Sequence, residues 1–72
     1  MKNNYIVYKL SFIDKNRTIE DIYITVTYLK NSNRVSFIYK DKRINFHVLK
    51  EYGLKEIKQL ITEYINGERE LK

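Results

Sequence analysis

The chain has 72 residues, a formal net charge of +5 and 43% hydrophobic residues, among them seven Tyr and three Phe. This length allows a single domain, and the absence of Cys excludes disulfides and thiolate metal sites. The longest apolar run has four residues, against about 20 for a membrane-spanning helix and roughly 7–15 for a signal peptide, so we expect a soluble cytoplasmic protein with no membrane partner.

The first fifty residues alternate between apolar and polar side chains with a period of two, which is typical of half-buried β-strands. β-branched and aromatic residues dominate the positions that this alternation places toward a core. Phe37 and Phe46 are predicted to face the core, while Ile38 and Asn45 face away from it. The predicted strands are residues 5–13, 21–30, 34–40 and 43–49.

Short turns between the later strands agree with this alternation. Asn and Asp tolerate the positive φ that two-residue turns require, so turns at residues 31–32 and 41–42 are predicted. Each turn would place two core-facing residues opposite each other, as a single inward face demands. The predicted pairs are Tyr28 with Val35 and Tyr39 with Ile44. The first connection, residues 14–21, is longer and leaves its register open.

After Lys50 the apolar period changes to 3.6, which predicts an amphipathic helix over residues 54–66. Gly53 is suited to the N-cap and Gly67 to the C-terminal stop. We therefore predict an α+β fold over residues 1–72, a four-stranded antiparallel meander with one C-terminal helix packed on one sheet face (ββββα). The tail, residues 68–72, is expected to fray.

The sequence offers little for catalysis, so we expect no enzyme, no metal and no cofactor. His47 is the only histidine and lies on the predicted outward face, where no second histidine or cysteine completes a metal site. Glu20 and Asp21 are adjacent in the sequence, so on a strand their side chains would point to opposite faces and would not form an acid–base pair.

The net positive charge lies in the half of the chain that contains the predicted strands. Residues 1–49 carry nine basic and four acidic residues, whereas residues 50–72 carry five of each. The predicted outward face places Lys40 beside Arg43, with Lys9 and Arg34 along the sheet and Tyr23 available for stacking. Such a face is suited to binding phosphates and bases, which predicts nucleic-acid binding, although a solvated surface has the same pattern.

The segment from Ile24 to Tyr64 combines a strand, an Asn-Ser-Asn turn, a strand, the basic turn 40–43, a strand and a Tyr52-Gly53 helix start. It resembles the three-stranded-sheet-plus-helix DNA-binding domains of ethylene-response factors and the arm-binding domains of integrases. The resemblance implies that the outward sheet face docks in the DNA major groove. The residues that it implies to face DNA are Thr25, Thr27, Arg34, Ser36, Lys40, Arg43 and Asn45.

A second class of function fits the same composition. A chain that begins with Met1, carries no catalytic set and is rich in Lys, Asn and Ile is typical of small phage or mobile-element proteins. Some of these dock on a protein or ribonucleoprotein partner and inhibit it, as anti-CRISPR proteins do, and would act in the host cytoplasm. Val7, Ile38 and the open sheet edges also suggest a symmetric homodimer.

Overall fold

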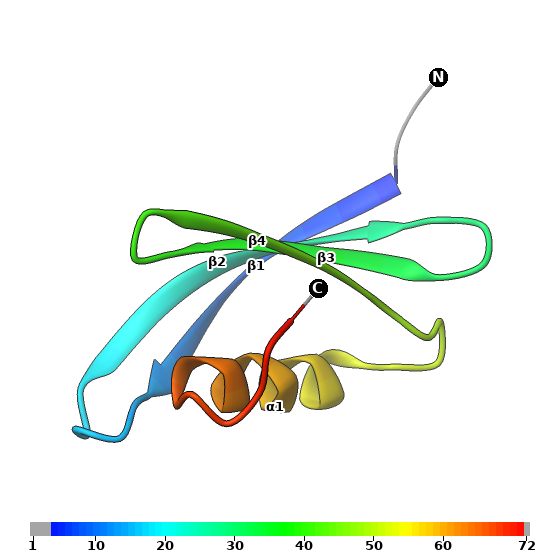
Figure 1. The fold of residues 1–72 in the computed structure, drawn as a ribbon. Coiled ribbons are helices and arrows are strands. Elements are labelled where there is room, and N and C mark those ends of the chain that lie inside the picture. The colour runs from blue at the N-terminus through cyan, green and yellow to red at the C-terminus, as the bar shows by residue number, and fades with distance from the viewer. Residues whose placement is uncertain (1–3, 72) are drawn as a thin grey trace.

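The computed structural model describes residues 4–71 and contains four strands followed by one helix (Figure 1). The strands form one antiparallel sheet in the order β1-β2-β3-β4, which confirms the predicted ββββα fold. The elements are β1 Asn4–Ile13, β2 Ile19–Tyr28, β3 Asn33–Tyr39, β4 Lys42–Val48 and α1 Leu54–Ile65.

The molecule has two layers, because α1 lies across one face of the sheet (Figure 1). We call this face the inward face and the opposite one the outward face. The alternation of the strands is confirmed: Phe37 and Phe46 are 3% and 4% exposed, whereas Ile38 is 59% exposed and Asn45 is exposed. The buried core comprises Phe12, Ile22, Ile24, Val26, Val35, Phe37, Phe46, Val48, Ile57 and Ile61.

Local hydrogen bonds cap both ends of α1. At the N-terminus, the Gly53 amide donates a hydrogen bond of 2.7 Å to Glu56 Oε1, which satisfies one of the free amides of the first turn. At the C-terminus, Gly67 has φ +74°, and its amide donates to the Tyr64 carbonyl while the Glu68 amide donates to the Glu63 carbonyl. This pair of bonds is a Schellman motif, which ends the helix.

Replacing Gly67 with alanine should lower the free energy of unfolding by about 1–2 kcal/mol, because the left-handed backbone conformation is less stable by that amount for an L-residue with a Cβ. A Cβ there would meet no atom within 4 Å, so the loss reports backbone conformation alone. Gly67→Asn is the control, and its loss should be smaller because Asn tolerates this conformation. Urea unfolding of the three proteins measures the difference, and equal losses for both variants would contradict it.

The two later turns differ from the predicted ones. The β3–β4 turn consists of Lys40 and Asp41, whose φ angles are +50° and +63°, so that Tyr39 pairs with Lys42 instead of Ile44. Residues 29–32 connect β2 to β3, with the Leu29 amide donating to the Ser32 carbonyl. Each register is therefore shifted by two residues from the prediction. A shift of two keeps every side chain on its face, which is why the alternation did not reveal it.

The β1–β2 hairpin is the longest ladder of the sheet, with Cα partners from Asn4 opposite Tyr28 to Ile13 opposite Ile19. Its loop is organised by Asp14, whose Oδ1 accepts hydrogen bonds of 2.9 Å from the amides of Asn16 and Thr18. β2 thus begins at Ile19, two residues earlier than predicted, because this loop occupies only residues 14–18.

The tail has contacts that the sequence did not predict. Arg69 Nε lies 2.7 Å from Glu63 Oε1, and Leu71 packs against the core. The hydrogen bond from Arg69, together with one from Gln59, lowers the pKa of the Glu63 carboxyl. Residues 68–71 therefore turn back from the helix toward the sheet instead of extending away from it (Figure 1). Lys72 lies outside the described residues.

No helix within residues 4–71 is long and apolar enough to cross a membrane.

Candidate nucleic-acid interface

Eight of the nine predicted binding residues lie on the outward face of the sheet. Because successive side chains of a strand alternate between faces, the observed registers bring these residues into rows across the strands. One row contains Tyr5, Thr27, Arg34 and His47. The next contains Val7, Thr25, Ser36 and Asn45. Farther along, Lys9 lies opposite Tyr23 on one hairpin, and Ile38 lies opposite Arg43 on the other.

Lys40 is the exception, and its predicted place beside Arg43 is wrong. It lies in the β3–β4 turn, and its ammonium is 5.4 Å from the ring centroid of Tyr39, a partly buried residue of the inward face. Arg43 faces Ile38 instead. The reason is the two-residue shift of register, which moves Lys40 out of the ladder and into the turn.

The hydroxyl residues of the face are less available than predicted. Thr27 is only 8% exposed, because it lies in an interior strand between Tyr5 of β1 and Arg34 of β3. Ser36 is half-buried, and its hydroxyl donates a 2.6 Å hydrogen bond to Asn45 Oδ1. This bond orients the Asn45 amide. Thr27 is therefore not a contact residue in this structure.

The charge of the face is more mixed than the sequence suggested. Asp21, expected at a strand end, lies inside β2 opposite Ser11, whose hydroxyl donates to Asp21 Oδ1 at 2.6 Å. Lys9 Nζ is 3.9 Å from Asp21 Oδ2, a distance at which exposed pairs interact weakly. Arg34 and Arg43 form no ion pair with any residue in the described part of the chain. These two guanidinium groups are the cations of the face that remain free for a ligand.

Apolar and aromatic side chains are exposed on the same face. Tyr5 is 59% and Tyr23 64% exposed, values that are high for residues within a sheet. The Tyr23 ring lies near Lys9, whose Nζ is 5.9 Å from the ring centroid. Four aliphatic residues of the outward face are also more than half exposed. They are Val7, Ile13, Ile19 and Ile38.

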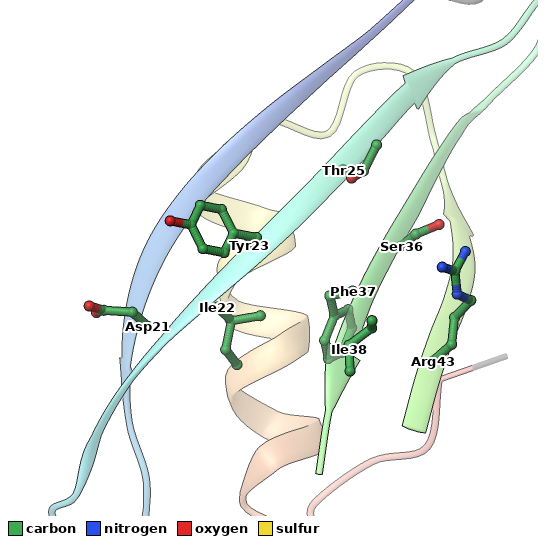
Figure 2. A pocket seen from close by; sticks show the side chains of 8 residues that line it. All are labelled: Asp21, Ile22, Tyr23, Thr25, Ser36, Phe37, Ile38 and Arg43. Atoms are coloured by element: carbon green, nitrogen blue, oxygen red, sulfur yellow. The ribbon is translucent and has the colours of Figure 1, made fainter. Parts of the chain in front are cut away.

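A surface cavity of about 350 Å³ opens where the two hairpins separate. The β2–β3 ladder ends at Ile24 opposite Phe37, while β1–β2 and β3–β4 continue beyond that point. Figure 2 shows Ile22, Phe37 and Ile38 at the gap between β2 and β3, with α1 behind it. The lining of the cavity is completed by Asp21, Tyr23, Thr25, Ser36 and Arg43. We call this cavity the hairpin notch.

The sequence analysis did not predict the hairpin notch or the position of Asp21 inside β2. It also did not identify Ile13 and Ile19 as exposed residues of the outward face. The alternation of the strands assigns side chains to faces, but it contains no information on where two paired strands separate. The odd-numbered apolar residues Ile13 and Ile19 did carry a signal, since they continue the outward alternation of β1 and β2 to the loop end of the hairpin.

No group of three or more His, Cys, Asp or Glu side chains within residues 4–71 is arranged to hold a metal ion. His47 is exposed and lies opposite Arg34.

No protein-family model, curated protein or solved structure matches this chain.

Proposed function

We propose that this protein is a non-enzymatic nucleic-acid-binding module and that the outward sheet face is its interface. The observation that carries the proposal is the pair of exposed tyrosines, Tyr5 and Tyr23. The same face also bears Lys9 and two guanidinium groups that form no ion pair within residues 4–71. Aromatic rings provide surfaces on which bases stack, and basic side chains neutralise phosphates. Binding to nucleic acid is also consistent with action in the cytoplasm.

The arrangement favours a single strand over a duplex. The resemblance to the ethylene-response-factor and integrase domains implied docking in the major groove, where polar side chains read base edges. Here Thr27 is buried, Lys40 is in a turn, and the rings of Tyr5 and Tyr23 are more than half exposed. Unstacked bases of a single strand can lie on such side chains, whereas the paired bases of a duplex offer only their edges. The hairpin notch adds an apolar recess beside Tyr23.

A salt titration with charge-matched variants tests this proposal. Replacing Arg34 and Arg43 by alanine should reduce the slope of log affinity against log salt by about 1.4 units on a single-stranded oligonucleotide, at about 0.7 unit for each phosphate that is no longer neutralised. The control replaces Lys50 and Lys55, two exposed residues outside the sheet, and removes the same net charge. Its slope should stay near that of the wild type. Fluorescence anisotropy with oligo(dT), a duplex of equal length and a structured RNA gives the affinities.

Two results would contradict the proposal. One is the absence of binding to all three nucleic acids at low salt. The other is an equal reduction of slope in the two double variants, because that reduction would reflect net charge and not the outward face.

Protein docking is the second candidate function. The observation in its favour is that Val7, Ile13, Ile19 and Ile38 lie exposed on the outward face, where a protein surface would bury them more fully than a nucleic acid. In this case the protein is an interaction module, such as a phage or mobile-element inhibitor of a protein or ribonucleoprotein. If nucleic acids fail to bind, isolation of partners from the source cell with wild type and an Ile38→Lys variant tests it. Partners retained equally by both would contradict docking on this face.

A further inference from the structure

The two edges of the sheet differ in how they are protected. A strand edge presents unpaired backbone N–H and C=O groups, and natural proteins shield such edges with charges or with a covering segment. At β4, Lys42 and Arg43 supply charge, and the tail residues Arg69 and Leu71 line a cavity together with the end of the strand. The β4 edge thus carries charge, and the tail lies near its last residues.

The β1 edge has almost none. Its ten residues, Asn-Tyr-Ile-Val-Tyr-Lys-Leu-Ser-Phe-Ile, contain one charge, no Gly and no Pro. Within residues 4–71, β1 pairs with β2 alone, and α1 lies on the inward face instead of beside the strand. A long, apolar and unshielded edge is the arrangement that promotes pairing with another strand.

The most exposed apolar side chains of β1 lie in the first half of the strand. Tyr5 and Val7, on the outward face, are 59% and 52% exposed. Ile6, on the inward face, is 46% exposed, although the same face buries Phe12 to 2% beside Lys58 of the helix. Both faces of residues 4–7 therefore carry apolar surface that the rest of the described chain does not cover.

We propose that β1 is a dimerisation edge, on which the β1 strand of a second copy of this chain pairs antiparallel about a two-fold axis at Val7. A second copy fits because antiparallel pairing of identical strands is self-complementary and closes as a symmetric dimer. This axis places Ile6 opposite the partner's Tyr8. It also places Lys9 opposite the partner's Tyr5, which keeps the two Lys9 ammonium groups apart and allows a cation–π contact. The sheet becomes continuous over eight strands.

The axis at Val7 is preferred to its neighbours for electrostatic and steric reasons. An axis at Lys9 would set the two ammonium groups directly opposite each other, which is destabilising. An axis at Tyr8 would bring Phe12 into the ladder opposite the partner's Asn4, although Phe12 lies under Lys58 of the helix. Pairing over residues 4–10 avoids both problems and covers the most exposed apolar run of the strand.

Sedimentation velocity over a range of protein concentrations tests the dimer. The wild type should change from monomer to dimer as its concentration rises, and Ile6→Lys should shift this change at least tenfold upward in concentration, because an inward-pointing charge blocks edge pairing. Leu49→Lys is the matched control, since Leu49 is 58% exposed and lies outside β1. It should associate like the wild type. Ile6 is half exposed, so the variant should keep the circular dichroism spectrum of the wild type.

The absence of cysteine from this chain allows a second, independent test. Val7→Cys places the new thiol on the proposed axis, where directly opposed residues of antiparallel strands have Cα atoms about 4.5–5.5 Å apart, within the range of a disulfide. It should form a disulfide-linked dimer on mild oxidation, and His47→Cys on the β4 edge should not. Monomer at every concentration, or equal cross-linking of the two variants, would overturn the proposal. Association that Ile6→Lys leaves unchanged would also overturn it.

Discussion

Replacing Phe46 with alanine should lower the free energy of unfolding by about 3–5 kcal/mol, a large share of the stability of so small a domain. Phe46 is 4% exposed and lies on the inward face of β4. Its ring meets that of Phe37 edge-on, with centroids 6.4 Å apart, and the Phe37 ring meets Tyr64 of the helix at 6.0 Å. The substitution therefore removes buried apolar surface and leaves a cavity where the sheet meets the helix.

Urea unfolding, followed by circular dichroism, gives this change from the shift of the midpoint at constant slope. The matched control is Ile38→Ala. Ile38 is also a large apolar residue of the β3–β4 hairpin, but it is 59% exposed on the outward face, so its replacement should change stability by no more than about 0.5 kcal/mol. If Phe46→Ala does not fold, Phe46→Leu keeps part of the packing and should show an intermediate loss. Equal effects of Phe46→Ala and Ile38→Ala would contradict the assignment of faces.

Replacing Tyr23 with alanine should weaken the binding of a single-stranded oligonucleotide by about 5- to 150-fold, because stacking of one base on an aromatic ring contributes about 1–3 kcal/mol. Tyr23 is 64% exposed and borders the hairpin notch, so its ring is accessible to a base. The substitution removes little buried surface, and the stability of the fold should change by no more than about 0.5 kcal/mol. Tyr5→Ala should have an effect of the same kind.

Two controls identify stacking as the cause. Tyr23→Phe keeps the ring and should keep most of the affinity, whereas a decrease equal to that of Tyr23→Ala would assign the effect to the hydroxyl. Ile13→Ala removes another exposed apolar residue of the outward face, and its affinity should stay near that of the wild type. Anisotropy titrations at fixed, moderate salt compare the four proteins, because affinities at different salt concentrations are not comparable.

Local periodicity in the sequence determined the element types and the faces of the strands. The period of two predicted that Phe46 faces the core and that Asn45 faces away from it, and both residues lie on the predicted sides of the sheet. A period of 3.6 predicted the helix over residues 54–66, and α1 spans Leu54–Ile65. These features were predictable because the side-chain direction of a strand or helix repeats with the backbone, and burial selects apolar residues on that repeat.

Only the tertiary structure decided which residues lie side by side. Alternation is unchanged when a strand shifts by two residues, so it could not separate the predicted pairing of Tyr39 with Ile44 from the observed pairing with Lys42. The positive φ angles of Lys40 and Asp41 select the observed turn, and they remove Lys40 from the candidate interface. The burial of Thr27, the separation of the hairpins at the notch and the unprotected β1 edge depend on neighbouring strands, which local sequence patterns do not encode.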